Sequence, residues 1–194
     1  HCLYPDGGQY EGNWLGGKRH GEGSMAWASG RTFSGVWAEH RPHGEGFGWD
    51  PERGLSFTGE WRAGRPEGKG RAEYSTGEPP AVARVYEGTM VRGQEEGGGR
   101  CRFADGCVYI GEWRAGKQNG EGQLVVPYAG AVCRGTWRDG KLHGSARLEL
   151  GMAAEEDLEA TTAPRPPSRD AGQGMVATPG TAAVVADQAR DTVA

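Results

Sequence analysis

The 194-residue sequence predicts an all-β protein: a single-layer antiparallel meander of stacked β-hairpins, followed by a largely irregular C-terminal tail. Three observations predict it. A short aromatic–glycine phrase recurs about every 23 residues, tight-turn dipeptides close most copies, and residues 1–150 show no sustained helical period. A fixed period of this length indicates an array of small units, each packed against its neighbours. Such arrays form long surfaces, which favours binding over catalysis.

The recurring phrase has the form aromatic-x-Gly-x-Trp, and a Gly-x-Gly follows each copy on the returning strand. The six copies begin at Tyr10, Phe33, Phe57, Tyr86, Tyr109 and Cys133, so the sixth lacks the first ring, and the fourth has Met90 in place of the Trp. The Gly-x-Gly stands at Gly21/Gly23, Gly44/Gly46, Gly68/Gly70, Gly97/Gly99 and Gly120/Gly122, and the sixth copy has Gly144 with Ala146. We therefore expect one partial and about six repeats over residues 1–150.

Each unit is expected to be two short strands with one aromatic face. Side chains alternate between faces along a strand, so Tyr10, Gly12 and Trp14 share a face while Glu11 and Asn13 take the other. The glycines leave room on the aromatic face for large rings. The opposite face is mostly polar and suits contact with water.

The aromatic face lacks a second layer in this sequence, although a sheet normally buries its apolar face. Its own twist, a second copy of the chain in a homodimer, or another protein would have to cover it. The rings are expected to be mainly structural, and those that also contact a partner would come from this set: Tyr10, Trp14, Trp27, Phe33, Trp37, Phe57, Trp61, Tyr86, Tyr109, Trp113 and Trp137.

The second unit carries one extra residue, which puts Phe47 and Trp49 out of phase with the aromatic face. One interpretation is a bulge or longer turn near Asp50-Pro51. The other is a small exposed aromatic pair that a partner covers. Both remain open at this point.

The third interval is longer than the others, and its excess residues 78–85 include Pro79 and Pro80. Because proline cannot donate to a strand ladder, a loop that leaves the sheet is expected over 78–85. It marks either a bend or an exposed contact made by the two prolines. Residues 151–194 form a low-complexity tail, with a short helix expected at 152–160.

Charge and composition argue against several classes of function. Residues 1–150 hold 19 Lys and Arg against 19 Asp and Glu, so the net charge of −4 comes from the tail. A neutral body argues against nucleic-acid binding and makes membrane association unlikely. No apolar run is long enough to span a bilayer. The residues form no catalytic constellation, so we expect no enzyme activity, no cofactor and no metal site. The scattered cysteines are expected to be buried thiols.

The pattern from Tyr10 to Gly23 resembles the MORN repeat (membrane occupation and recognition nexus), and the likeness covers residues 1–150. This resemblance implies a groove-like sheet of hairpins that acts as a scaffold.

Two segments show a narrower resemblance. Residues 4–14 and 37–46, the latter with His40 where most units have Gly, are similar to the radial spoke head protein 1 group of ciliary axonemes. That resemblance implies a non-enzymatic cytoplasmic scaffold in the cytoskeleton of the cilium or flagellum, bound to other radial spoke head proteins and supporting motility. The alternative is a peripheral membrane or cytoskeletal adaptor that binds acidic lipids or a membrane-bound partner.

Overall fold

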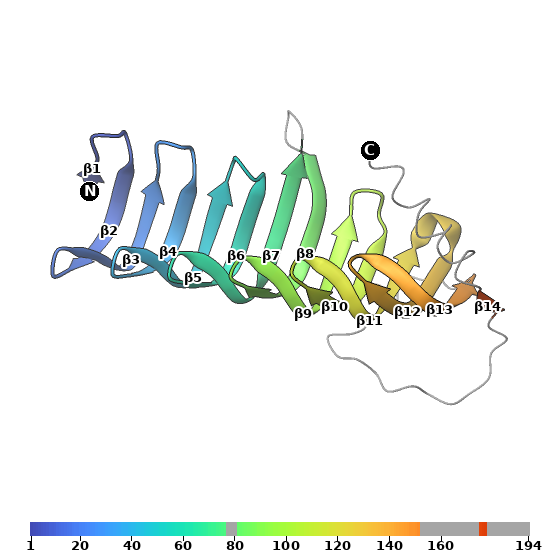
Figure 1. Ribbon diagram of the computed structural model, residues 1–194. Coiled ribbons are helices and arrows are strands. Elements are labelled where there is room, and N and C mark those ends of the chain that lie inside the picture. The colour runs from blue at the N-terminus through green and yellow to red at the C-terminus, as the bar shows by residue number, and fades with distance from the viewer. Residues whose placement is uncertain (77–80, 152–174, 178–194) are drawn as a thin grey trace. The chain divides into compact units, whose positions relative to one another are not determined.

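The computed structural model describes residues 1–76, 81–151 and 175–177. The strands pair in chain order, and the fold class predicted from the sequence, an all-β antiparallel meander, is confirmed (Figure 1). Pro79, Pro80, and the helix expected at 152–160 lie outside the described residues. The strands are β1 (Cys2–Leu3), β2 (Gln9–Leu15), β3 (Lys18–Ala26), β4 (Thr32–Ala38), β5 (Arg41–Asp50), β6 (Leu55–Arg62), β7 (Arg65–Thr76), β8 (Ala81–Val91), β9 (Gln94–Phe103), β10 (Val108–Arg114), β11 (Lys117–Val126), β12 (Ala131–Arg138), β13 (Lys141–Leu150) and β14 (Met175–Ala177), with a 3₁₀ turn, η1 (Pro127–Ala129).

The chain divides into two compact units, His1–Cys101 and Arg102–Ala194. In the first unit successive hairpins lie side by side and turns join the strands alternately at two opposite edges (Figure 1). Each unit has its own buried side chains, and each is described separately below.

The first glycine of the Gly-x-Gly lies at a bulge in the β2–β3, β4–β5, β6–β7, β10–β11 and β12–β13 hairpins. In the β2–β3 hairpin Gly12 is opposite Gly23, but two residues further on Trp14 is opposite Arg19. The extra residues on β3 surround Gly21, whose φ is 68°. A side chain is strained at such a φ, which explains why glycine recurs at this position in every repeat.

The second glycine makes room for the first aromatic ring of its own hairpin. A Cβ on Gly46 would lie 2.5 Å from Cζ of Phe33, because that ring lies across the backbone there. Tyr10 lies over Gly23 in the same way, and its hydroxyl donates to the Asn13 carbonyl oxygen at 3.0 Å. The rings therefore lie down on the sheet, and the aromatic face covers much of itself.

In the sixth repeat both the first aromatic ring and the second glycine are missing. Cys133 replaces the aromatic residue, and Ala146 replaces the second glycine opposite Gly135. With no ring to accommodate, the space is filled by other side chains: a Cβ on Gly135 would lie 3.0 Å from Cδ1 of Leu142 and 3.1 Å from the Ala146 Cβ. The ring and the glycine are thus a coupled pair, and the two are lost together.

A longer turn absorbs the extra residue of the second repeat. Asp50 pairs with Leu55 across the turn at residues 51–54, and the β5–β6 register shows no shift. Phe47 therefore points away from the aromatic face and is 44% exposed, and Trp49 is half-buried. On the aromatic face the register leaves Gly48, whose Cα the Trp61 ring covers.

The prediction of a loop over 78–85 is wrong for residues 81–85. Residues 81–85 belong to β8, where Thr76 pairs with Ala81 and Ser75 pairs with Val82. A register shift between Tyr74 and Ser75 accommodates the added length. The extra residues thus extend β7 and β8, because their backbone groups gain ladder partners by pairing with each other.

Candidate functional site

The structure buries most of the rings expected to contact a partner. Eight are at most 4% exposed: Tyr10, Phe33, Trp37, Phe57, Tyr86, Tyr109, Trp113 and Trp137. Trp14 is 43% exposed, and Trp27 and Trp61 are half-buried. Partner binding by this set stays a prediction, and the surface available for it is concentrated on the last three rings. Partner contact by Phe47 and Trp49 also stays a prediction. Phe47 lies on the other face and is 44% exposed, whereas the half-buried Trp49 lines the groove described below.

Edge-to-face ring contacts explain the burial. In the first unit the Tyr10 ring lies 5.3 Å from Trp14 of its own repeat and 5.3 Å from Trp37 of the next one. Nε1 of Trp37 also donates to the Gly23 carbonyl oxygen at 2.9 Å. In the second unit Tyr109 and Trp137 repeat this contact, with ring centroids 5.2 Å apart. Trp37 and Trp137 therefore each link their repeat to the one before it.

A groove of about 580 Å³ opens over the aromatic face of the first unit. The Trp27 and Trp61 rings line it together with Leu55 and the buried Phe57. Its charged lining is mainly basic, from Arg31, Arg53, Arg65 and Arg92, with Asp50 as its acidic residue. Arg31 and Asp50 form an ion pair at 3.4 Å, which leaves the other arginines as the excess charge.

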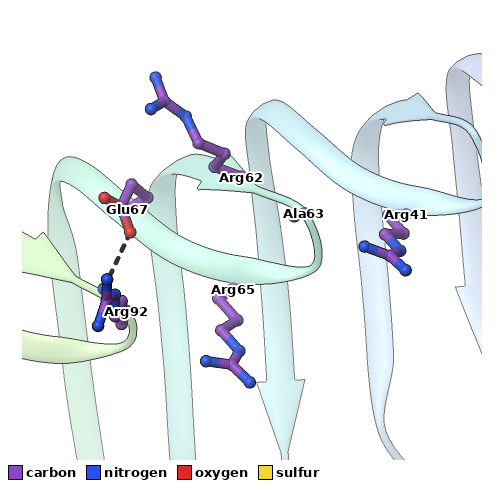
Figure 2. Close-up of a pocket in the computed structure, with 6 residues that line it drawn as sticks. All are labelled: Arg41, Arg62, Ala63, Arg65, Glu67 and Arg92. Atoms are coloured by element: carbon purple, nitrogen blue, oxygen red, sulfur yellow. Dashed lines mark hydrogen bonds between the residues drawn. The ribbon is translucent and has the colours of Figure 1, made fainter.

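A second recess of about 360 Å³ adjoins the turns of the same unit and shares Arg65 and Arg92 with the groove. Its lining comprises Arg41, Arg62, Ala63, Arg65, Glu67 and Arg92. Figure 2 shows the Arg41 and Arg65 side chains pointing the same way from their strands and Arg62 pointing the opposite way. The Glu67 carboxylate accepts the backbone N–H of Arg92 at 2.9 Å. The recess therefore holds four guanidinium groups and one carboxylate.

Sequence reasoning missed this arginine cluster. The total charge of residues 1–150 is zero, and that sum hid a local excess. The available signal was positional: a basic residue follows the tight turn in most repeats, as Lys18, Arg41, Arg65, Lys117 and Lys141. Only the structure shows that two of them, Arg41 and Arg65, line one recess of the first unit.

The titratable groups do not assemble into a metal site or an activated thiol in the part of the chain that the structure describes. No three His, Cys, Asp or Glu side chains converge there to hold a metal ion. Burial raises the pKa of the Cys101 thiol to about 12, which is the opposite of the shift that a reactive cysteine needs. Among residues 1–76, 81–151 and 175–177, no helix is long and apolar enough to cross a bilayer.

Comparison with known proteins identifies the repeat. The family model of the MORN repeat matches six segments: residues 10–30, 33–47, 57–78, 86–108, 109–125 and 133–150. No curated protein matches the chain at a significant level of similarity. The six matches follow the six hairpins, and they cover more than half of the sequence. The chain therefore belongs to the MORN-repeat family.

Proposed function

We propose that this protein is a non-enzymatic structural scaffold whose repeat array binds other proteins of a large assembly. The observation that carries the proposal is the groove of the first unit, where Trp27 and Trp61 stay partly open beside a basic rim. Most rings of the motif are buried by internal packing; Trp27 and Trp61 keep part of their surface open in this groove, and Trp14 is 43% exposed outside it. An apolar hollow with a few charged groups at its edge is the usual form of a specific binding site.

The assembly that we propose is the radial spoke head of the ciliary or flagellar axoneme, where the protein would bind other spoke-head subunits and support motility. Support comes from the likeness of residues 4–14 and 37–46 to that group. His40, which carries part of the likeness, adopts a φ of 70° in its turn. Its backbone N–H donates to the Arg19 carbonyl oxygen at 3.1 Å, so this turn is tied to the repeat before it.

Fractionation of cilia tests this assignment. A tagged full-length chain in ciliated cells should remain with the axoneme after the membrane is removed with detergent, together with the radial spoke proteins. It should be missing from axonemes of cells that lack radial spokes. Release with the detergent-soluble fraction would contradict the assignment.

The second candidate is a peripheral adaptor that binds acidic lipids, and the arginine recess is the observation that favours it. The neutral repeat body counts against it, because binding to anionic membranes gains from net positive charge. Flotation of the full chain with vesicles containing phosphatidylserine, at about 0.15 M salt, distinguishes the two. A chain that does not float with the vesicles at this ionic strength would favour the protein scaffold.

A further inference from the structure

The tight turns of the repeats carry a charge pattern that depends on pairs of neighbouring units. The basic residue after one turn faces a turn residue of the next repeat. In the first unit Lys18 Nζ lies 3.1 Å from Oε1 of Glu39. In the second unit Lys117 Nζ lies 4.0 Å from Oδ1 of Asp139. In both places the basic charge is neutralised within the chain.

The two acids occupy equivalent, unusual backbone positions. Glu39 and Asp139 both have a φ of 49°, in the left-handed region, as the turn residue before the basic strand. The equivalent residues of the third and fourth repeats are Ala63, with a φ of 50°, and Arg92, with a φ of 53°. The backbone is the same in all four turns, and only the side chain differs.

Arg41 and Arg65 therefore lack the acid that Lys18 and Lys117 have. The residue in the place of that acid is uncharged Ala63 for Arg41 and the like-charged Arg92 for Arg65. Within residues 1–76 and 81–151, no carboxylate forms an ion pair with Arg41, Arg65 or Arg92. Glu67 lines the same recess and is engaged by the Arg92 backbone. The recess thus presents positive charge that no carboxylate of the described residues balances by an ion pair.

The spacing of these turns fits one kind of anion. Gly64 N donates to the Pro42 carbonyl oxygen and Gly93 N to that of Pro66, each at 2.9 Å, which ties the three turns into one row. Each repeat adds two strands, so the turns recur at about 9.6 Å. A polyproline II segment rises about 3.1 Å per residue with three residues per turn, so every third side chain recurs on one face at about 9.3 Å.

We propose that the recess and the adjoining groove bind an acidic, extended segment of a partner protein. Carboxylates three residues apart would pair with Arg41 and with Arg65, the second of them also contacting Arg92, and intervening apolar side chains would enter the groove beside Trp61. This names the chemistry of the partner for the protein-binding function proposed above, and it rests on that function. A peptide fits better than a lipid surface, because the arginines adjoin an apolar hollow that side chains can fill.

Two labelled peptides of identical composition test the proposal on the full chain. One is (Glu-Pro-Pro)₄, with a carboxylate at every third residue, and the other places the same four Glu in a block beside the eight Pro. Fluorescence anisotropy at about 0.15 M salt should show the periodic peptide binding at least about 5-fold more tightly. Equal binding of the two peptides, or no binding of either, would overturn the proposal.

Substitutions that restore the missing acids supply the second arm. Ala63→Glu combined with Arg92→Asp places carboxylates where Glu39 and Asp139 stand in other repeats. It should weaken binding of the periodic peptide by at least about 10-fold. Glu39→Ala, one turn away and outside the recess, is the matched control and should change binding less than about 2-fold.

Folding and alternative ligands are checked on the same variants. Arg41→Gln with Arg65→Gln removes exposed charges, and it should weaken binding while the far-ultraviolet circular dichroism spectrum is unchanged. Unaltered peptide binding in both double variants would overturn the proposal. Full displacement of the peptide by phosphatidylserine vesicles or by inorganic phosphate, dependent on the same arginines, would also overturn the proposal. If the peptide fails while the chain still stays with the axoneme, the recess is wrongly assigned and the scaffold function stands.

Discussion

The Glu95 carboxylate accepts a hydrogen bond from the Tyr74 hydroxyl at 2.5 Å, inside the first unit, where the Glu95 side chain is 4% exposed. Arg84 donates to the same carboxylate oxygen at 2.9 Å, and its guanidinium lies 3.9 Å from the centre of the Tyr74 ring. Burial raises the pKa of the Tyr74 hydroxyl, and the bond to Glu95 raises it further. A charged cluster thus completes the fourth repeat, which has Met90 in place of tryptophan.

Removal of the Glu95 acceptor should destabilise the first unit. Glu95→Ala leaves Arg84 partly buried without its counterion and Tyr74 without its acceptor, so we expect a loss of about 2–4 kcal/mol in the free energy of unfolding. Glu95→Gln keeps an acceptor for the hydroxyl and should cost less. Urea unfolding of the full chain measures both, and equal losses would show that the charge, not the hydrogen bond, dominates.

The coupling between ring and glycine predicts a non-additive pair. Gly46→Ala should cost more than about 2 kcal/mol, because its Cβ would overlap the Phe33 ring. In Phe33→Cys, which imitates Cys133, the same substitution should cost at least about 1 kcal/mol less. Gly98→Ala is the control, since a Cβ there meets no atom within 4 Å. Additive losses in the double-mutant cycle would refute the coupling.

Stability should fall at alkaline pH through Cys101. Burial raises the pKa of this thiol from 9.0 to about 12, so the unfolded chain releases the proton first. Its contribution is complete below pH 9 and is lost as the pH rises toward 12, by at most about 1.4 kcal/mol per pH unit. Urea unfolding at pH 8 and pH 10 should show a smaller decrease for Cys101→Ala than for the unaltered chain. Identical decreases would contradict this.

The tryptophans of the first two repeats occupy the same place in the motif but differ in burial. Trp37 is 1% exposed and bonds to the Gly23 carbonyl, so Trp37→Ala should cost about 3–5 kcal/mol. Trp14 is 43% exposed, and Trp14→Ala should cost less than about 2 kcal/mol. Unfolding midpoints in urea compare the two variants. Similar losses of stability in the two variants would contradict the prediction that the more exposed Trp14 contributes less than Trp37.

The fold was predictable because its signals are local and repeated. Period, turn dipeptides and alternation determine the hairpins, and the added residue of the second repeat correctly places Phe47 on the outer face. The lengthening of β8 from Ala81 was not predictable, since prolines at 79 and 80 favoured a loop and pairing depended on the opposite strand.

The candidate site was less accessible to sequence reasoning. Most of the aromatic residues named from the motif are buried against neighbouring side chains, and the motif alone does not show which of them stay exposed. The basic recess depends on which turn residue faces Arg41 and Arg65, and that is a relationship between repeats. Only the register and the left-handed turn residues show that Ala63 and Arg92 stand where Glu39 and Asp139 stand elsewhere.

The central claim is that the groove of the first unit contacts another protein, and photocrosslinking in ciliated cells tests it most directly. Benzoylphenylalanine in place of Leu55, which lines the groove, is compared with the same residue in place of Leu15, which is 65% exposed and lines neither hollow. We predict a protein adduct from position 55 that Ala63→Glu with Arg92→Asp abolishes, and no such adduct from position 15. A lipid adduct at position 55, or a protein adduct that the two acids leave unchanged, would contradict the account.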